Sequence, residues 1–442
     1  MSSDASGIAP GETSASAAVP KMRFRAVGAG TIGNLLEWYD YTIYGFLVPV
    51  MAPLFFPDVS PAVAILSSFG VLGVGFLGRP LGGVLFGIWG DRYGRRFSLA
   101  LAMVVMGVAT FAAGLLPTFA AAGILAPVLL VLLRLIQGLS MGGQWSGGGT
   151  FIVEYAPPTR RGMYGGIHVM GVTLGVLAGS LAVLVTSSAT TAADMATFGW
   201  RIPFFIGALT AAAGVLLRLG VEETPAWREA RDGRAGADST PLKTTFRTRS
   251  NLRAVSTAFG VTVLQAINAW VLLVWIVTFL SATVGLDLVT ALLVNSIGLT
   301  VMIVCLPLFG LVSDKFGRKR VMLVAAVAMF ILVTPVFWGM RSGSLAIVIV
   351  SYVVIIACHT LYAAPQVAML VELFPTSVRV TGLSIGYNIS QTLFGGFAAF
   401  IASLLITLTG DPSAATWYVM AGAGVSAIVL MRVKETAFLP LR

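Results

Sequence analysis

Residues 87–96 read GIWGDRYGRR, and residues 310–319 read GLVSDKFGRK. Both fit the pattern G-x-x-x-D-[RK]-[YF]-G-R-[RK], which is thus present in each half of the chain. A weaker echo joins EYAPPTRRG at 154–162 to ELFPTSVRVTG at 372–382. Motifs that recur in the same order in two halves of a chain indicate a duplicated structural unit. The sequence therefore predicts two similar halves.

The composition around these motifs is that of a membrane protein. Of the 442 residues, 57% are hydrophobic and only 10% are charged, and the mean hydropathy is +0.91. A helix crosses a bilayer in roughly 20 apolar residues, and about twelve such stretches can be placed. They cover approximately residues 26–52, 62–89, 97–117, 123–152, 162–187, 201–220, 252–283, 288–312, 320–340, 344–371, 381–408 and 415–432. The predicted fold class is an all-α integral membrane protein with about twelve transmembrane helices in two pseudo-symmetric bundles.

Hydrophilic stretches divide the chain further. The expected parts are a disordered N-terminal tail, an N-terminal bundle, a linker, a C-terminal bundle and a C-terminal tail, at residues 1–25, 26–220, 221–251, 252–433 and 434–442. Lys and Arg gather in the loops on the side of the termini, whereas several loops on the other side contain none. The positive-inside rule therefore predicts cytoplasmic tails and linker, in a multi-pass protein of a bacterial-type inner membrane.

The repeated loop motif, the spans and the central linker resemble the major facilitator superfamily. Within it, GNLLEWYDYTIYGF at 33–46, RLIQGLSMGGQW at 134–145 and TGLSIGYN at 381–388 resemble the metabolite:proton symporter family. That family includes carriers for citrate, 2-oxoglutarate, shikimate, and proline or betaine. The resemblance implies transport by alternating access. One departure is Gln144, which stands where members of the family commonly carry a glutamate.

Charged side chains near the middle of the predicted spans are the strongest site candidates. The N-terminal half places Glu37, Asp40, Arg79 and Arg134 there. At 1.5 Å per residue, Glu37 lies roughly 16 Å and Asp40 roughly 21 Å into the first span. An unpaired charge costs roughly 2.5–3.5 kcal/mol at a helix centre, so we expect these groups to pair or to line a polar cavity. A purely structural ion cluster that sets helix register is the alternative.

The functional interpretation gives these charges two roles. Glu37 or Asp40 takes up a proton, and Arg79 and Arg134 attract the carboxylate of the substrate. Protonation of the acid would remove a competitor for the arginines, which would couple the two events. Because Gln144 cannot titrate, Glu37 and Asp40 are the acids left at this depth to carry the proton.

Neutral polar side chains complete the predicted substrate site. The C-terminal half has no charged residue well inside its spans, so hydrogen bonding is expected there. The candidates in the two halves are Asn34, Tyr41, Gln137, Gln144, Tyr362, Gln366, Tyr387, Asn388 and Gln391. An interhelical hydrogen bond is the competing interpretation for each of them. For the lone histidines, His168 and His359, we favour packing over proton transfer.

The repeated loop motif supplies a second kind of site. Its basic residues hold the loop at the cytoplasmic face, but they do not explain Asp91 and Asp314. Each aspartate either neutralises neighbouring cations or faces a helix N-terminus of the other half, where negative charge is favourable. The family resemblance implies the second, a gate contact that closes the cytoplasmic side. The gate candidates are Gly87, Asp91, Arg92, Gly94, Arg95, Gly310, Asp314, Lys315, Gly317 and Arg318.

The function that follows is a proton-coupled secondary transporter that imports a small carboxylate-bearing metabolite. A symporter for proline- or betaine-type compatible solutes is the first alternative, and a drug:proton antiporter is the second. We expect no enzyme, because no catalytic constellation such as H-E-x-x-H is present, and neither a metal nor a cofactor besides the coupled proton. The expected partners are an anionic or zwitterionic metabolite and the lipid bilayer, with the protein acting as a monomer. Nucleic acid is not expected, because the basic residues are spread among short loops.

Overall fold

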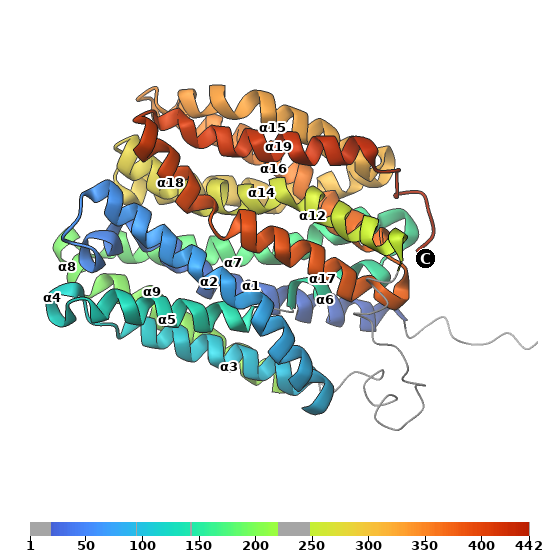
Figure 1. Cartoon of the computed structure of the whole chain (residues 1–442), viewed down its shortest axis with the longest axis horizontal. Coiled ribbons are helices and arrows are strands. Elements are labelled where there is room, and N and C mark those ends of the chain that lie inside the picture. Colours follow the sequence, from blue (N-terminus) through green and yellow to red (C-terminus); the bar gives the residue numbers. More distant parts are fainter. Residues whose placement is uncertain (1–18, 94, 142–143, 220–247, 442) are drawn as a thin grey trace, which may run out of the picture.

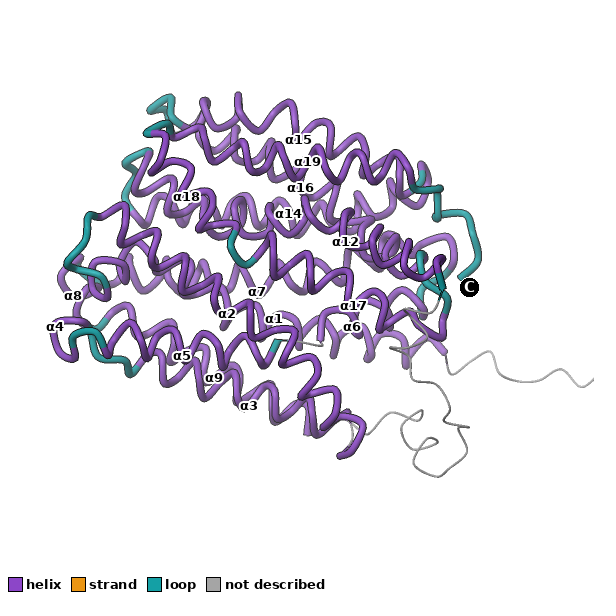
Figure 2. The backbone as a smooth tube through the Cα atoms, viewed as in Figure 1, coloured by secondary structure: helices purple, strands orange, loops and turns teal. Residues whose placement is uncertain are grey.

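The computed structural model describes residues 19–93, 95–141, 144–219 and 248–441. Within these residues every regular element is helical (Figure 2). Long apolar runs can satisfy their backbone polar groups inside a bilayer only as helices or closed barrels, and this chain forms helices. The predicted all-α class is correct.

The helices of the N-terminal half follow the predicted spans closely. In chain order they are α1 (Val19–Phe55), α2 (Pro61–Tyr93), α3 (Arg95–Gly114), α4 (Phe119–Ala122), α5 (Leu125–Ser140), α6 (Gln144–Glu154), α7 (Arg161–Ala189), α8 (Ala192–Thr197) and α9 (Ile202–Leu219). The fourth predicted span consists of two helices, α5 and α6. The short helices α4 and α8 are connections at one end of the bundle (Figure 1).

The helices of the C-terminal half repeat this order with irregular segments in two spans. They are α12 (Arg249–Trp270), α13 (Ile276–Thr278), α14 (Leu288–Phe316), α15 (Arg318–Met340), α16 (Leu345–Glu372), α17 (Arg379–Ser390), α18 (Ala398–Thr409) and α19 (Ala415–Arg432). Val271–Trp275 and Phe279–Thr283 flank α13 as π-helical turns, and Gln391–Gly395 forms another between α17 and α18. Single π-helical turns are frequent at functional sites.

Two of the predicted boundaries differ from the structure. The helix α1 begins at Val19, so the last residues assigned to the N-terminal tail are helical. The helix α12 begins at Arg249, so it includes the end of the predicted linker. Most of the linker and residues 1–18 lie outside the described residues.

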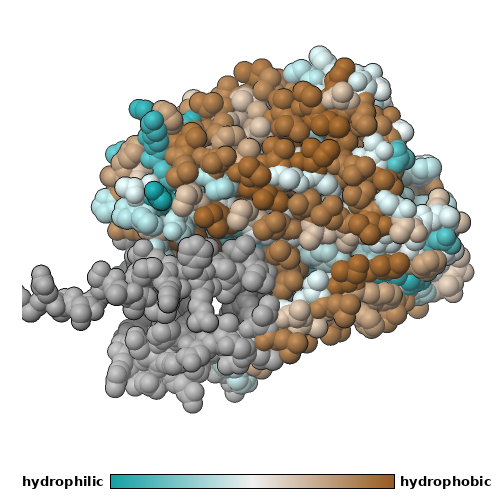
Figure 3. Space-filling model, turned by 180° about the vertical axis from the view of Figure 1, so that it is seen from behind, coloured by the Kyte–Doolittle hydropathy of each residue, from teal (hydrophilic) through white to brown (hydrophobic). Residues whose placement is uncertain are grey.

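The surface of the bundle matches a lipid environment. Among the described residues, ten helices are long and apolar enough to cross a membrane, and the apolar part of α3 is shorter. Figure 3 shows hydrophobic side chains over the middle of the visible face and hydrophilic ones towards its ends. We refer to the end of the bundle at which Arg161, Asp314 and Glu372 lie as the motif end, and to the other as the opposite end.

The two halves lie side by side and meet along α7 and α14 (Figure 1). At the motif end Gly162 of α7 faces Gly310 of α14 so closely that a Cβ on either would overlap the carbonyl oxygen of the other. One turn further in, a Cβ on Gly166 would overlap the backbone of Leu306. Small residues permit this backbone contact, as they do at helix interfaces in membranes.

A similar contact joins α2 to α5 inside the N-terminal half. Gly138 of α5 lies against the carbonyl oxygen of Gly75, and Gly82 of α2 lies against Leu139. Of the glycines in these two contacts, Gly310 belongs to the predicted gate motif. The close approach of α2 and α5 fixes the positions of Arg79 and Arg134, which these helices carry.

The α2–α5 contact gives a test of the packing. Gly138→Ala places a methyl group on the carbonyl of Gly75, and overpacking of this kind costs about 1–3 kcal/mol. We expect a lower apparent melting temperature of the detergent-solubilised protein, measured by size-exclusion chromatography after heating. Gly147→Ala is the matched control, because a Cβ there meets no atom within 4 Å. Equal melting temperatures for the two variants would contradict the contact.

Candidate functional site

Asp314 joins the two halves at the motif end. Its Oδ1 accepts a hydrogen bond from the backbone N–H of Gly162 and its Oδ2 from that of Met163, both at 2.9 Å. These donors belong to the first turn of α7, where unpaired N–H groups and the helix dipole favour an anion. The family resemblance implied a helix N-terminus of the other half as the partner of Asp314, and Asp314 makes that contact in the structure.

Basic and acidic side chains of both halves surround this contact. Arg318 forms an ion pair with Asp314, with its Nη2 2.7 Å from Oδ1, and the same Nη2 lies 3.6 Å from Glu372. Glu372 lies 4.0 Å from Arg161 of α7 and accepts a 2.6 Å hydrogen bond from Thr436. These groups are almost completely buried, so their charges are weakly screened by solvent.

The segment after α19 also reaches this network. Glu435 accepts a 2.8 Å hydrogen bond from the backbone N–H of Arg318, at the first residue of α15. The carbonyl oxygen of Leu439 accepts a 3.0 Å hydrogen bond from Arg161. Gly317 has a φ of +98°, a conformation that favours glycine, and it provides the tight turn between α14 and α15.

A second ion pair crosses the halves beside the first. Arg379 at the start of α17 pairs with Glu154 at the end of α6. Glu154 and Glu372 are the acidic residues with which the two weaker repeated motifs begin, and their partners Arg379 and Arg161 also lie in those motifs. The duplicated sequence thus forms two reciprocal ion pairs between the halves.

The first copy of the gate motif is only partly visible. Gly94 and the side chains of Asp91, Arg92 and Arg95 lie outside the described residues, and Gly87 is described only as part of α2. In the second copy Lys315 is exposed, with its Nζ 5.4 Å from the ring centre of Phe316.

Contacts between the halves also form towards the opposite end. The rings of Trp38 in α1 and Trp270 in α12 are stacked with their centres 6.0 Å apart. Beyond them, Gly45 lies against Val274, and Gly73 of α2 lies against Phe397. On the side of the motif end, the halves touch where the ring of Trp145 in α6 stacks on the ring of Tyr387 in α17.

A cavity lies between these two sets of contacts, near the middle of the spans. The N-terminal half lines it with Trp38, Trp145, Val169, Val172 and Thr173, and the C-terminal half with Gln265, Ala269, Leu273, Met302, His359, Ala363 and Gln366. A concave, mostly apolar site with a few polar groups at the interface of two bundles is the usual form of a small-molecule site.

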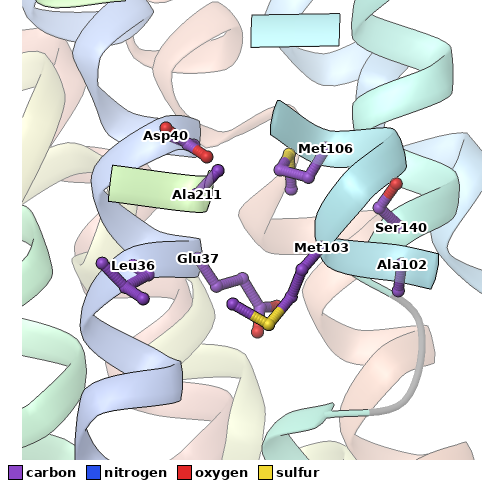
Figure 4. A pocket seen from close by; sticks show the side chains of 8 residues that line it. All are labelled: Leu36, Glu37, Asp40, Ala102, Met103, Met106, Ser140 and Ala211. Carbon is purple, nitrogen blue, oxygen red and sulfur yellow. The ribbon is translucent and has the colours of Figure 1, made fainter. Parts of the chain in front are cut away.

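The predicted proton carriers lie in a different place. Glu37 and Asp40 line a pocket inside the N-terminal half, together with Leu36, Ala102, Met103, Met106, Ser140 and Ala211 (Figure 4). Four helices contribute to it: α1, α3, α5 and α9. Asp40 is 1% exposed, and its Oδ1 has no hydrogen-bond partner among the described residues. Glu37 is 9% exposed and points towards Met103 (Figure 4).

The arginines predicted beside these acids are buried without the expected hydrogen bonds. Arg134 is 1% exposed, and none of its three guanidinium nitrogens has a partner among the described residues. Its guanidinium lies 4.1 Å from the ring centre of Tyr44 instead. Arg79 is also 1% exposed, and its Nε and Nη1 have no partner in the described part of the chain. Among the described residues Arg134 therefore makes no hydrogen bond to an acid, and the aromatic face of Tyr44 lies beside its guanidinium instead.

Most of the neutral candidates bond to neighbouring helices. Tyr362 donates to the carbonyl of Val261 at 2.6 Å, Gln137 donates to Thr110 at 2.9 Å, and Asn34 contacts His168 at 3.3 Å. Among all the neutral candidates with a described side chain, Gln366 is the one that lines the central cavity. Asn388 is half-buried and does not line it, and the side chain of Gln144 lies outside the described residues.

Three other candidates lie just behind the cavity wall. Gln391 donates to Gln265 at 2.9 Å and to the hydroxyl of Tyr387 at 2.8 Å. The ring of Tyr387 stacks on Trp145, with ring centres 3.6 Å apart. Tyr41 packs edge-on against Trp270 with its hydroxyl unpartnered among the described residues.

Sequence reasoning missed the aromatic part of the cavity. Trp38 and Trp145 were not considered as site residues, because an aromatic residue in an apolar helix is usually a core residue. The available signal was their position within the two family-like strings, next to Glu37 and Gln144. His359 was considered and was assigned to packing. Its place in the cavity wall depends on how α16 faces α7, which the periodicity of one helix does not reveal.

Comparison with known proteins places these features in a family. The chain is 32% identical over 431 residues to the proline/betaine transporter of Escherichia coli K12, covering 95% of this chain and 85% of the relative. It is 35% identical over 436 residues to the ectoine/proline transporter ProP of Corynebacterium glutamicum, covering 96% and 86%. Another relative is the glycine betaine/proline/ectoine/pipecolic acid transporter OusA of Dickeya dadantii, 31% identical over 430 residues, with 95% and 84% covered.

Solved structures share the fold. A partially occluded, inward-open form of the xylose transporter XylE from E. coli has a TM-score of 0.76 and 20% identity, over 94% of this chain and 99% of that one. A crystal structure of a D-xylose-proton symporter has the same TM-score and identity, over 95% of this chain and 98% of that one.

The sugar (and other) transporter family matches residues 27–241 and again residues 228–442. The chain therefore belongs to this transporter family, within the major facilitator superfamily.

Proposed function

We propose that the protein is a proton-coupled symporter that takes up a small zwitterionic solute of the proline or betaine type by alternating access. The observation that carries this proposal is the cavity between the halves, whose described lining combines indole rings with neutral polar groups. Indole faces attract ammonium groups, and N–H donors bind carboxylates. The three relatives, which are named as transporters of proline, betaine or ectoine, agree with such a ligand.

A carboxylate-bearing anion is the second candidate substrate. Arg79 and Arg134 favour it, because their guanidinium nitrogens are buried and lack several hydrogen bonds within the described residues. A carboxylate that reached them would satisfy those donors. Neither arginine lines the cavity, however, so an anion would have to enter between the cavity wall and α2.

The proton site in this proposal is the pocket inside the N-terminal half. Asp40 carries the proton, and Glu37 in the same pocket modulates it or shares it. Ionisable groups buried in a membrane protein are usually part of ion or proton pathways, because their burial is costly. The pocket and the cavity are lined by different faces of α1, so protonation in one can change the position of α1 in the other.

The motif end is the cytoplasmic end in this proposal, since Lys and Arg gather in its loops. The contact of Asp314 with α7 is then the cytoplasmic gate, and the two reciprocal ion pairs beside it support the closed state. The opening of this end requires these contacts to break while those around Trp38 and Trp270 hold.

Transport by the purified protein in proteoliposomes tests the function directly. A zwitterion taken up with one proton carries one net positive charge, so an inside-negative potential should drive radiolabelled L-proline or glycine betaine inwards without a pH gradient. The potential supplies about 2.3 kcal/mol per 100 mV for that charge. A monoanion with one proton would not respond to the potential. Absence of proton-driven uptake of both solutes and of citrate and 2-oxoglutarate would contradict the proposal.

Asp40→Asn tests the proton site. One coupled proton and a pH gradient of one unit support up to about tenfold accumulation of solute. The variant should lose this accumulation but keep exchange of internal for external solute, which needs no net proton movement. Asp194→Asn is the control, because Asp194 is a half-buried residue in a connection at the opposite end, far from the pocket. If Asp40→Asn and Glu37→Gln both accumulate solute like the wild type, the proton lies elsewhere.

Asp314→Asn tests the gate. An amide has one acceptor oxygen and no charge, so the variant loses a hydrogen bond to α7 and the ion pair with Arg318. Hydrogen bonds to charged groups contribute about 1.5–3 kcal/mol, which corresponds to roughly a tenfold to hundredfold larger population open at the motif end. Val367 of α16 is buried against Gly149 and Gly165 of the N-terminal half. The measurement is the modification rate of Val367→Cys by an impermeant thiol reagent in inside-out vesicles, with Cys305 and Cys358 replaced by Ser.

Asp287→Asn is the matched control for the gate. Asp287 also caps a helix, accepting a 2.9 Å hydrogen bond from the N–H of Thr290, but both residues belong to α14 and its N-cap. Its loss should leave the modification rate unchanged. An unchanged rate in Asp314→Asn as well would overturn the assigned gate.

A further inference from the structure

His359 occupies a distinct place in the central cavity. It lies on α16 with Ala363 and Gln366, at i, i+4 and i+7, so the three residues share one face of that helix. His359 is 1% exposed, and its Nδ1 has no hydrogen-bond partner among the described residues. A buried imidazole nitrogen without a partner is costly, and the cavity is the space in which a ligand can supply one.

The other lining side chains determine what kind of ligand fits. The described lining contains no Asp, Glu, Lys or Arg, so a ligand with net charge would be buried without a counter-charge. Besides the indole N–H groups of Trp38 and Trp145, its polar groups are the amides of Gln265 and Gln366, the Thr173 hydroxyl and the His359 ring. The Thr173 hydroxyl donates to Val169 of its own helix at 3.0 Å. The amides and the imidazole therefore remain as donors for a ligand.

The amide of Gln265 is partly oriented by its neighbours. Its Oε1 accepts a 2.9 Å hydrogen bond from Gln391, which leaves its N–H groups as the part to offer a ligand. Within the described part of the chain, Gln366 has one long side-chain contact, of 3.5 Å to Thr262. An imidazole has at least one N–H in either protonation state. This wall of the cavity is thus rich in N–H donors, which suits a carboxylate.

The facing wall is aromatic and firmly supported. Trp38 stacks on Trp270, and Trp145 is stacked on Tyr387 and lies edge-on to His168. Indole rings fixed in this way offer a π face to a cation at little entropic cost. An ammonium group against these rings would place a carboxylate a few bonds away near α16.

We infer that His359 is a substrate-contacting residue that donates a hydrogen bond to the carboxylate of a net-neutral zwitterion whose ammonium group lies on Trp38 and Trp145. This inference rests on the proposed transport of a zwitterion. It assigns the recognition of the substrate carboxylate to His359, which is not part of the proton site. His359 thereby supplies, from the C-terminal half, the recognition of the carboxylate that the sequence attributed to the arginines of the N-terminal half.

Exchange kinetics of three variants in proteoliposomes test the inference. His359→Leu removes the donor, and we expect the L-proline concentration for half-maximal exchange to rise roughly tenfold to a hundredfold, the loss typical of one hydrogen bond to a charged group. His359→Gln keeps an N–H donor and should stay within about threefold of the wild type. Cys358→Ala, one residue away and outside the cavity lining, is the control and should be unchanged.

A ligand without a carboxylate separates contact from a general structural effect. L-Proline methyl ester should compete more weakly than L-proline for the wild type, and in His359→Leu the ratio of the two inhibition constants should fall towards one. A purely structural role would weaken both ligands equally and would lower the melting temperature of both His359 variants. Unchanged L-proline affinity and an unchanged ratio in His359→Leu would overturn the inference. Failure of wild-type exchange with any zwitterion would instead contradict the proposed function.

Discussion

The contact between α7 and α14 is the constraint on which the rest of the structure depends. Gly162 and Gly310 let the two backbones touch, because neither carries a Cβ that would overlap the facing carbonyl. At this short separation Asp314 reaches the N–H groups of Gly162 and Met163 directly. The same alignment brings Glu372 towards Arg161. A bulkier residue at either glycine would separate the halves and remove the carboxylate from the helix N-terminus that stabilises it.

The helix α1 lines two different sites, the cavity between the halves and the pocket inside the N-terminal half. Trp38 and Asp40 are two residues apart on α1, about 200° around the helix axis, so they face different sides. Trp38 lines the cavity between the halves, whereas Asp40 lines the pocket within the N-terminal half. Movement of α1 therefore changes both sites at once. This geometry offers a physical route for coupling that does not require the proton and the solute to compete for the same arginine.

Some features could be predicted from the sequence because they depend on local physics. The spans follow from apolar length, and the ends of α2 and α14 follow from the repeated motif. For Asp314 the residues left two partners open, a neighbouring cation or a helix N-terminus, and the family resemblance implied the second. The cavity wall was harder to predict. Tyr362, Gln137 and Asn34 look like ligand contacts in the sequence, yet each bonds a neighbouring helix. A polar side chain in a membrane helix can satisfy either role, and only the facing helix decides.

The sequence by itself determined the class of protein, the duplication, the spans and the residues that cannot be lipid-facing, because the bilayer penalises every unpaired backbone group and charge in the same way wherever it occurs. The tertiary structure decided which of those residues meet. It placed Arg134 on the ring of Tyr44, moved the acids of α1 into a pocket of their own, and turned Trp38, Trp145 and His359 towards one cavity. These outcomes depend on the rotation of each helix against its neighbours, and that rotation is set by glycine contacts between segments far apart in the chain.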